Sequence, residues 1–311
     1  MLKLSKWPGS RITGQEGTKF ICHFSSEVDS NELTKSNKLL NLSNTKFEPW
    51  MSHIIYPENF SELNGDSSLD LDIIDLNKRA QVFSNSENLN LWNIDPDLNP
   101  NVTLMGKSDM NFALFKESLK SVFDIFNKID SSWHLRKTNL ICEILPMVSH
   151  SNDYSMREDG AGTSCLLYRK GIFLSLPKNS SNLIFELSLN LVHELGHQAL
   201  MLYEHLDDIV VGSSKQKVFS VIRRTERPAI QSCHALVATA YMLEFMVNAK
   251  DDLVLLTNKE YFLNRRDQLY SSLIEGIEIL KKIPMTNLGK QIFDELVAFS
   301  IWLSESHKHE F

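Results

Sequence analysis

The stretch "LVHELGHQAL", residues 191–200, holds the pattern His-Glu-x-x-His at His193, Glu194 and His197. Residues four apart on a helix share a face, so a helix here brings both imidazoles to one side. Asn182 is expected to cap this helix, which should run to about Glu204. Two imidazoles on one helical face can bind a single metal ion.

Other polar side chains follow the same face of this predicted helix. Glu186 and Asn190 lie on it, whereas Leu187, Leu191 and Leu195 lie on the opposite side. A row of His, Glu and Asn is too polar for an ordinary core face. The row indicates a polar cavity or a metal, although a pattern with three fixed positions also occurs by chance.

Outward from this helix, the chain predicts a small sheet before it and more helices after it. The second strand is expected to turn near Arg169 into a hairpin, and Pro228 to fit the first turn of a helix. The strands are expected over 139–148 and 165–177, and the further helices over 108–129, 228–248, 259–282 and 287–305. We therefore expect an α+β fold that is mostly helical, with a zincin-like metal-binding helix preceded by a small sheet.

Composition limits the possible partners and the compartment. The net charge of −7 argues against nucleic acid, which usually requires a basic face. The most apolar stretch, residues 183–203, carries four ionisable side chains and does not suit a membrane span. The four cysteines lie far apart without a C-x-x-C pair and read as reduced thiols. We expect a soluble cytoplasmic protein; the sequence does not indicate its oligomeric state.

A third metal ligand must come from outside the pentad, because such sites take three protein ligands and leave positions open. The metzincin pattern requires Gly and His where this chain has Leu200 and Tyr203, so that class is excluded. Glu204 lies on the same helix, about 10 Å along the axis from His197 at 1.5 Å per residue, and is badly placed. Glu226 and Glu244 remain open as carboxylate ligands.

His234 is the better third ligand. It lies among Ala, Val and Leu on the next predicted helix, in "CHALVATAYM". A lone histidine on an apolar helix is ordinarily a core residue satisfied by one hydrogen bond. The histidine pair on the preceding helix favours the ligand interpretation here.

Two blocks of the chain resemble a known family. They are "GIFLSLP" followed by "LSLNLVHELGHQAL", and "VFSVIRRTERPAIQSCHALVATAYM", in which a histidine stands six residues after an Arg-Pro step. They resemble the H-E-x-x-H peptide-modification proteins encoded beside ribosomally made peptide natural products. The resemblance covers roughly residues 105–250. It implies an iron(II)- and 2-oxoglutarate-dependent dioxygenase that hydroxylates a side-chain β-carbon in a precursor peptide, with His193, His197 and His234 as metal ligands.

The charges of the metal and the co-substrate would balance in such a site. Three neutral imidazoles leave an iron(II) ion its full charge, which the dianion 2-oxoglutarate can neutralise; the commoner arrangement has two histidines and a carboxylate. The distal carboxylate of 2-oxoglutarate requires a cation, and Arg is the natural bidentate partner. Arg227 is expected to serve because it lies seven residues, about two turns, before His234; Arg224 is the reserve candidate. A solvated basic turn is the ordinary alternative for this segment, which also contains Arg223.

Two other functions remain open. In a zinc peptidase, Glu194 would be the general base, and Tyr203 or Tyr241 would stabilise the oxyanion. In the hydroxylase, Glu194 would orient a metal-bound water or the substrate, or support the ligands. A structural zinc is the weakest alternative, because such sites usually contain cysteine and only Cys233 is near.

The chain is expected to divide at residue 104. Residues 1–104 are rich in Ser and Asn, which favour turns, and this region either recognises the substrate or packs onto the core. Residues 105–311 form the metal-binding catalytic domain.

Overall fold

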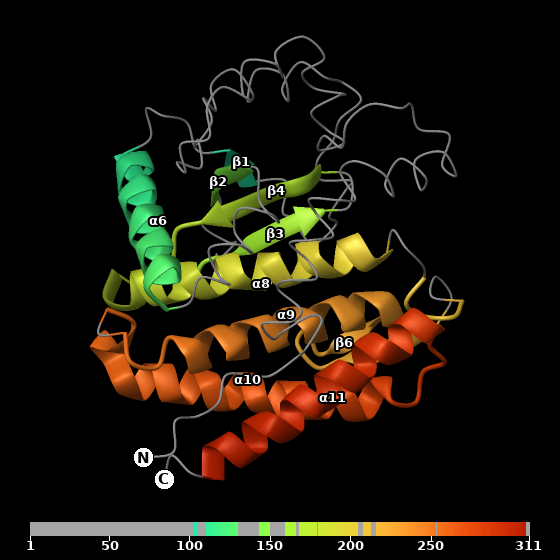
Figure 1. Cartoon of the computed structure of the whole chain (residues 1–311). Helices are drawn as coiled ribbons and strands as arrows, with labels where there is room; N and C mark the ends of the chain where they lie inside the picture. The colour runs from blue at the N-terminus through green and yellow to red at the C-terminus, as the bar shows by residue number, and fades with distance from the viewer. Residues whose placement is uncertain are drawn as a thin grey trace, which may run out of the picture.

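The computed structural model describes residues 102–104, 110–129, 143–149, 159–165, 168–178, 180–204, 208–212, 216–252 and 254–308. Residues 1–101, and with them nearly all of the expected N-terminal region, lie outside this part of the chain. In the described part, a small sheet lies over a stack of long helices (Figure 1). This arrangement confirms the expected α+β fold dominated by helix.

The sheet has four strands in the order β1-β2-β4-β3. The strands are β1 (Val102–Leu104), β2 (Glu143–Ser149), β3 (Gly162–Cys165) and β4 (Tyr168–Ser175). The central pair β2–β4 is parallel, and β1 and β3 pair antiparallel on the two outer sides. Among the described strands, β3 therefore forms one edge of the sheet, and β1, from the end of the region assigned to 1–104, forms the other.

The prediction of a turn near Arg169 is wrong. Arg169 lies inside β4, and the hairpin joins Cys165 of β3 to Tyr168. The Arg-Lys-Gly sequence has the composition of a turn, but β4 pairs with a strand on each side, with Gly171 opposite Glu143. Pairing on both sides overrides the local preference of these residues.

The helices agree with the predicted ones to within about three residues at each end. Asn182 immediately precedes the pentad helix α8, as expected of a cap, and lies in the short helix η3 (Ser180–Asn182). The helices are α6 (Met110–Ile129), α8 (Leu183–Glu204), α9 (Ala229–Asn248), η4 (Leu255–Asn258), α10 (Lys259–Leu280) and α11 (Asn287–Lys308).

A β-hairpin that the sequence did not predict connects α8 to α9. Its strands are β5 (Lys217–Ser220) and β6 (Thr225–Pro228), which pair antiparallel. Each has four residues, and only β5 alternates between exposed and buried side chains, so the strand signal is weak. Pro228 ends β6 and caps α9 with an extended ψ of 137°, one residue before the position expected for it.

Helix α9 is the centre of the core. It packs between α8 and α10 (Figure 1), and its residues from Leu236 to Met246 are all buried. Among the described residues it is the one helix long and apolar enough to cross a membrane, but 72% of its apolar window is buried inside the protein. That burial is compatible with the core helix of a soluble protein.

Gly196, inside the pentad, lets α8 and α9 come into direct contact. A Cβ at this position would lie 2.6 Å from Cα of Ala238 on α9. Only glycine permits such an approach of two backbones. The contact fixes the spacing between the helix that carries His193 and His197 and the helix that carries His234.

Candidate metal centre

The two pentad histidines lie together on α8, as their spacing requires. The ring centroids of His193 and His197 are 4.5 Å apart. Together with Glu194 they form a group whose ligand atoms all lie within 4.8 Å of one another. Both imidazoles are partly exposed, whereas Glu194 is buried. This group could hold a metal ion.

The carboxylate of Glu194 has a partner on each oxygen. Oε1 lies 2.8 Å from Nδ1 of His193, and Oε2 accepts a hydrogen bond of 2.6 Å from the hydroxyl of Ser164 on β3. Gly162 makes room for this carboxylate, because a Cβ there would lie 2.9 Å from Oε1. Glu194 thus ties the pentad to the edge strand, and Ser164 is a participant that the sequence analysis missed.

His234 comes to the same place from α9. Its Nδ1 lies 3.3 Å from Nδ1 of His197, and the two ring centroids are 5.3 Å apart. Two nitrogens that each lie 2.0–2.1 Å from one ion are separated by roughly 2.8–3.4 Å at octahedral to tetrahedral angles. The separation between His197 and His234 therefore fits two ligands of one ion. His234 is not in the 4.8 Å group around His193, so His197 is the member that links the two helices.

Glu204 contacts His234, not His197. Its Oε2 lies 2.8 Å from Nε2 of His234, on the far side of the ring from His197. The distance along α8 argued against Glu204 as a ligand of the pentad's ion. His234 on α9 thus lies beside the last two turns of α8, between His197 and Glu204.

The surroundings keep His197 neutral. Burial lowers its pKa well below the ordinary value, and the charges of His193, His234, Arg223 and Arg227 lower it further. A neutral imidazole has a lone pair for a metal. The charges of these two arginines act in the same direction as burial, which favours the neutral ring.

The two arginines predicted to bind the cofactor lie in different parts of the β5–β6 hairpin. Arg227 lies on β6 and is partly buried. Arg224 lies in the turn with a positive φ of 55°, is 66% exposed, and pairs with Glu275 on α10 at 3.5 Å. Arg223 and Arg224 are thus exposed in the turn, and Arg227 is the most buried of the three arginines.

The residues needed for the alternative functions are placed less favourably. Tyr203 and Tyr241 are buried in the core, with 3% and 0% of their surface exposed. Burial and the charge of Glu204 raise the pKa of the Cys233 thiol to about 12, so it stays protonated. Neither Glu226 nor Glu244 belongs to the His193 group among the described residues.

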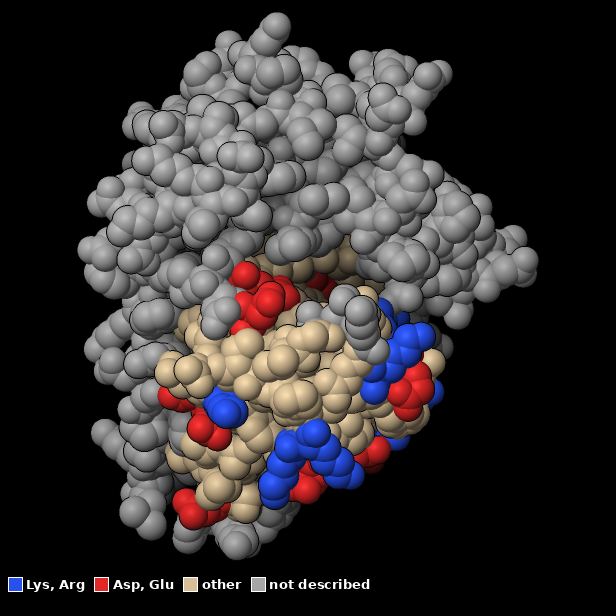
Figure 2. Space-filling view, turned by 90° about the vertical axis from the view of Figure 1, so that its right-hand side faces the viewer, with Lys and Arg blue, Asp and Glu red and all other residues tan. Residues whose placement is uncertain are grey.

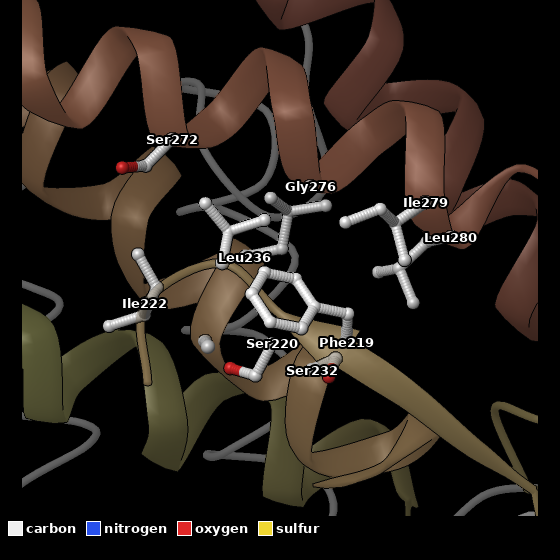
Figure 3. A pocket seen from close by; sticks show the side chains of 11 residues that line it. Phe219, Ser220, Ile222, Ser232, Leu236, Ser272, Gly276, Ile279 and Leu280 are labelled. Atoms are coloured by element: carbon white, nitrogen blue, oxygen red, sulfur yellow. The ribbon is translucent and has the colours of Figure 1, made fainter. Parts of the chain in front are cut away.

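Figure 2 shows the face at the right of Figure 1, where one group of acidic side chains and separate groups of basic side chains lie on either side of a surface of other residues. A hollow lies behind α9, between the β5–β6 turn and α10 (Figure 3). It measures about 20 Å³ and admits little more than a water molecule. None of the candidate site residues lines it.

No protein-family model matches this chain, and a search of curated proteins finds no match either. The resemblance to the H-E-x-x-H peptide-modification proteins therefore rests on the two sequence blocks that carry it.

Proposed function

We propose that the protein is an iron(II)- and 2-oxoglutarate-dependent hydroxylase that modifies a side-chain β-carbon of a ribosomally made precursor peptide. One observation carries the proposal: His197 lies between His193 and His234 and within the influence of two arginine charges. The sequence resemblance supports the same activity, and we expect it in the cytoplasm.

The donor set suits this chemistry. His193, His197 and His234 would hold iron(II), which with 2-oxoglutarate supplies the activation of O₂ and the hydroxylating power. Arg227 would pair with the distal carboxylate of 2-oxoglutarate, and Arg223 would add positive charge beside it. The buried faces of α8 and α9 would hold the ligands rigidly, because both helices pack in the core.

The edge strand supports a peptide as the substrate. β3 has one partner among the described strands, β4, and its Ser164 bonds to the pentad glutamate. An extended peptide can add to an exposed strand edge through main-chain hydrogen bonds. A peptide bound along β3 would pass close to the histidines of α8.

A zinc peptidase is the second candidate, favoured by Glu194 lying within 4.8 Å of both pentad histidines. A general base must lie within hydrogen-bond reach of the water that it deprotonates. Each oxygen of Glu194 has one partner, His193 or Ser164, and keeps a lone pair that could accept a proton. The hydroxylase is preferred because the sequence resemblance supports it and the charges of Arg223 and Arg227 act on His197.

The test is an anaerobic preparation of the full chain loaded with iron(II) and then given 2-oxoglutarate, O₂ and synthetic precursor-like peptides. We expect O₂-dependent formation of succinate and a peptide heavier by one oxygen atom, both lost in His193→Ala. Gln231→Ala is the matched control, because Gln231 is exposed on α9 one turn before His234. Peptide cleavage by the zinc-loaded chain, without succinate from the iron-loaded chain, would establish the peptidase instead.

A further inference from the structure

We infer that Glu204 is a positioning residue for His234: its carboxylate fixes the tautomer and ring orientation that present Nδ1 of His234 to the metal. The inference rests on the metal centre proposed above. It assigns a role to a residue that is not a ligand and that the sequence argument had set aside.

The first observation is the direction of the His234 ring. Nε2 lies 2.8 Å from Glu204 and Nδ1 lies 3.3 Å from His197, so opposite sides of the ring face the two partners. An ionised carboxylate only accepts hydrogen bonds, so Nε2 of His234 must carry the proton. The neutral ring then has its lone pair on Nδ1, the nitrogen that faces His197.

The second observation is the position of Glu204 on its helix. It is the last residue of α8, and the last turn contains no basic residue. A carboxylate at a helix C-terminus is unfavourable, because the helix dipole is negative there. Capping therefore does not account for a glutamate here, whereas the contact with His234 does.

The third observation is the partial burial of the pair. The side chain of His234 is 15% exposed and that of Glu204 is 23% exposed. Partial burial limits competition from water for the hydrogen bond. Metal-bound histidines commonly donate their second ring nitrogen to a carboxylate, and loss of such a partner typically lowers metal affinity about 10- to 100-fold.

The experiment compares the full-length wild type with Glu204→Ala and Glu204→Gln, using Co(II) as the probe. Co(II) affinity is measured by competition with a chelator, and the tautomer of His234 is read in the metal-free protein by ¹⁵N NMR. The His234 signals are identified by their absence in His234→Ala. Glu275→Gln is the control, because Glu275 is an exposed helix carboxylate that pairs with Arg224, away from His234.

We expect Glu204→Ala to bind Co(II) about 10- to 100-fold more weakly and to lose the Nε2-protonated preference of His234. Glu204→Gln should fall between it and the wild type, since its amide oxygen still accepts a hydrogen bond. Wild-type affinity in Glu204→Ala would overturn the inference. So would a change in the number of Co(II) ligands without a change in tautomer, because Glu204 would then be a ligand itself.

Failure of the metal centre gives a different result. A wild-type chain that binds no Co(II) would overturn the proposed function and this role together. If the wild type binds Co(II) and Glu204→Ala binds it equally well, only the role of Glu204 fails.

Discussion

Arg227 and Arg224 are three residues apart, but Arg227 is partly buried on β6, whereas Arg224 is exposed in the turn and pairs with Glu275. If Arg227 pairs with the distal carboxylate of 2-oxoglutarate, Arg227→Ala removes hydrogen bonds to a charged group, which contribute about 2 kcal/mol. We expect the affinity for 2-oxoglutarate to fall roughly 30-fold. Metal binding should remain, because arginine is not a ligand.

The measurement is a titration of 2-oxoglutarate into the iron-loaded chain, followed by the metal-to-ligand charge-transfer band. Arg224→Ala serves as the control and should leave the affinity unchanged, since Arg224 is exposed and pairs with Glu275. Equal affinities in both variants would remove Arg227 from the anion site.

Glu194 offers a second test at the level of one side chain. A Gln at this position keeps an oxygen for the Ser164 hydroxyl but loses the charge beside His193. A hydroxylase needs no general base, so Glu194→Gln should retain part of its succinate formation and most of its metal. Loss of all turnover with full metal content would favour the peptidase.

The sequence anticipated most of the candidate ligands but not their supports. Helical spacing put His193 and His197 on one face, and the structure brings His234 within 3.3 Å of His197. That these residues bind a metal stays a prediction. The roles of Ser164 and Glu204 were not predicted, because they depend on how β3 and α9 cross α8. Spacing along the chain does not reveal such a crossing.

At the scale of elements, the contact of α8 with α9 at Gly196 is the most exacting feature near the site. In Gly196→Ala the new Cβ would meet the backbone of Ala238 at 2.6 Å, and the two helices must separate. Such overpacking costs about 1–3 kcal/mol, more than the ~1 kcal/mol that alanine adds to helix stability. We expect a lower free energy of unfolding and weaker Co(II) binding.

Gly276 on α10 is the matched control. A Cβ there would meet only Cδ1 of Leu236, the end of a flexible side chain. Figure 3 shows both residues at the hollow behind α9, which leaves Leu236 room to move. Gly276→Ala should therefore be neutral or stabilising in urea unfolding. The opposite order of the two variants would show that α8 and α9 are not in tight contact.

Elements with a strong periodic pattern were the ones predicted well. The long apolar helices are recognisable because their pattern persists over several turns. The β5–β6 hairpin was missed because four-residue strands carry too little pattern, and β6, "TERP", has none. Its existence depends on pairing with β5, not on its own composition.

At the scale of the whole molecule, a second polar cluster joins the beginning of α8 to α10. Glu186 is 1% exposed, and neither of its oxygens has a hydrogen-bond partner among the residues that the structure describes. Tyr261 has one hydroxyl proton and donates it to Asp159 at 3.1 Å, while Arg265 lies 3.8 Å from Asp159. The polar stripe predicted from the sequence thus has the candidate metal ligands at one end and this buried cluster at the other.

This cluster makes the stability depend on pH. Burial raises the pKa of Glu186 above its ordinary value near 4.5; the charge of Arg265 opposes the shift, and the charge of Asp159 adds to it. The folded state therefore prefers the protonated carboxyl. Its stabilising contribution is full below about pH 4.5 and is lost as the pH rises through the raised pKa.

Glu186→Gln should remove this dependence, because the amide is neutral at every pH. We expect the melting temperature of the variant to gain on that of the wild type as the pH is raised from acidic to neutral and alkaline. Glu226→Gln is the control, since Glu226 is exposed on β6 and should not alter the profile. A constant difference between Glu186→Gln and wild type at all pH values would contradict the argument.

The candidate ligands lie on two helices, α8 and α9, that the ribosome makes at different times. His197 and His234 are 37 residues apart. At roughly 5–20 residues per second of synthesis, the ribosome adds His234 about 2–7 s after His197. In that interval the nascent chain has the pentad but lacks both the third imidazole and the helix that buries α8. If the three histidines bind an ion, complete binding and the burial of α8 against α9 therefore both wait until α9 has been made.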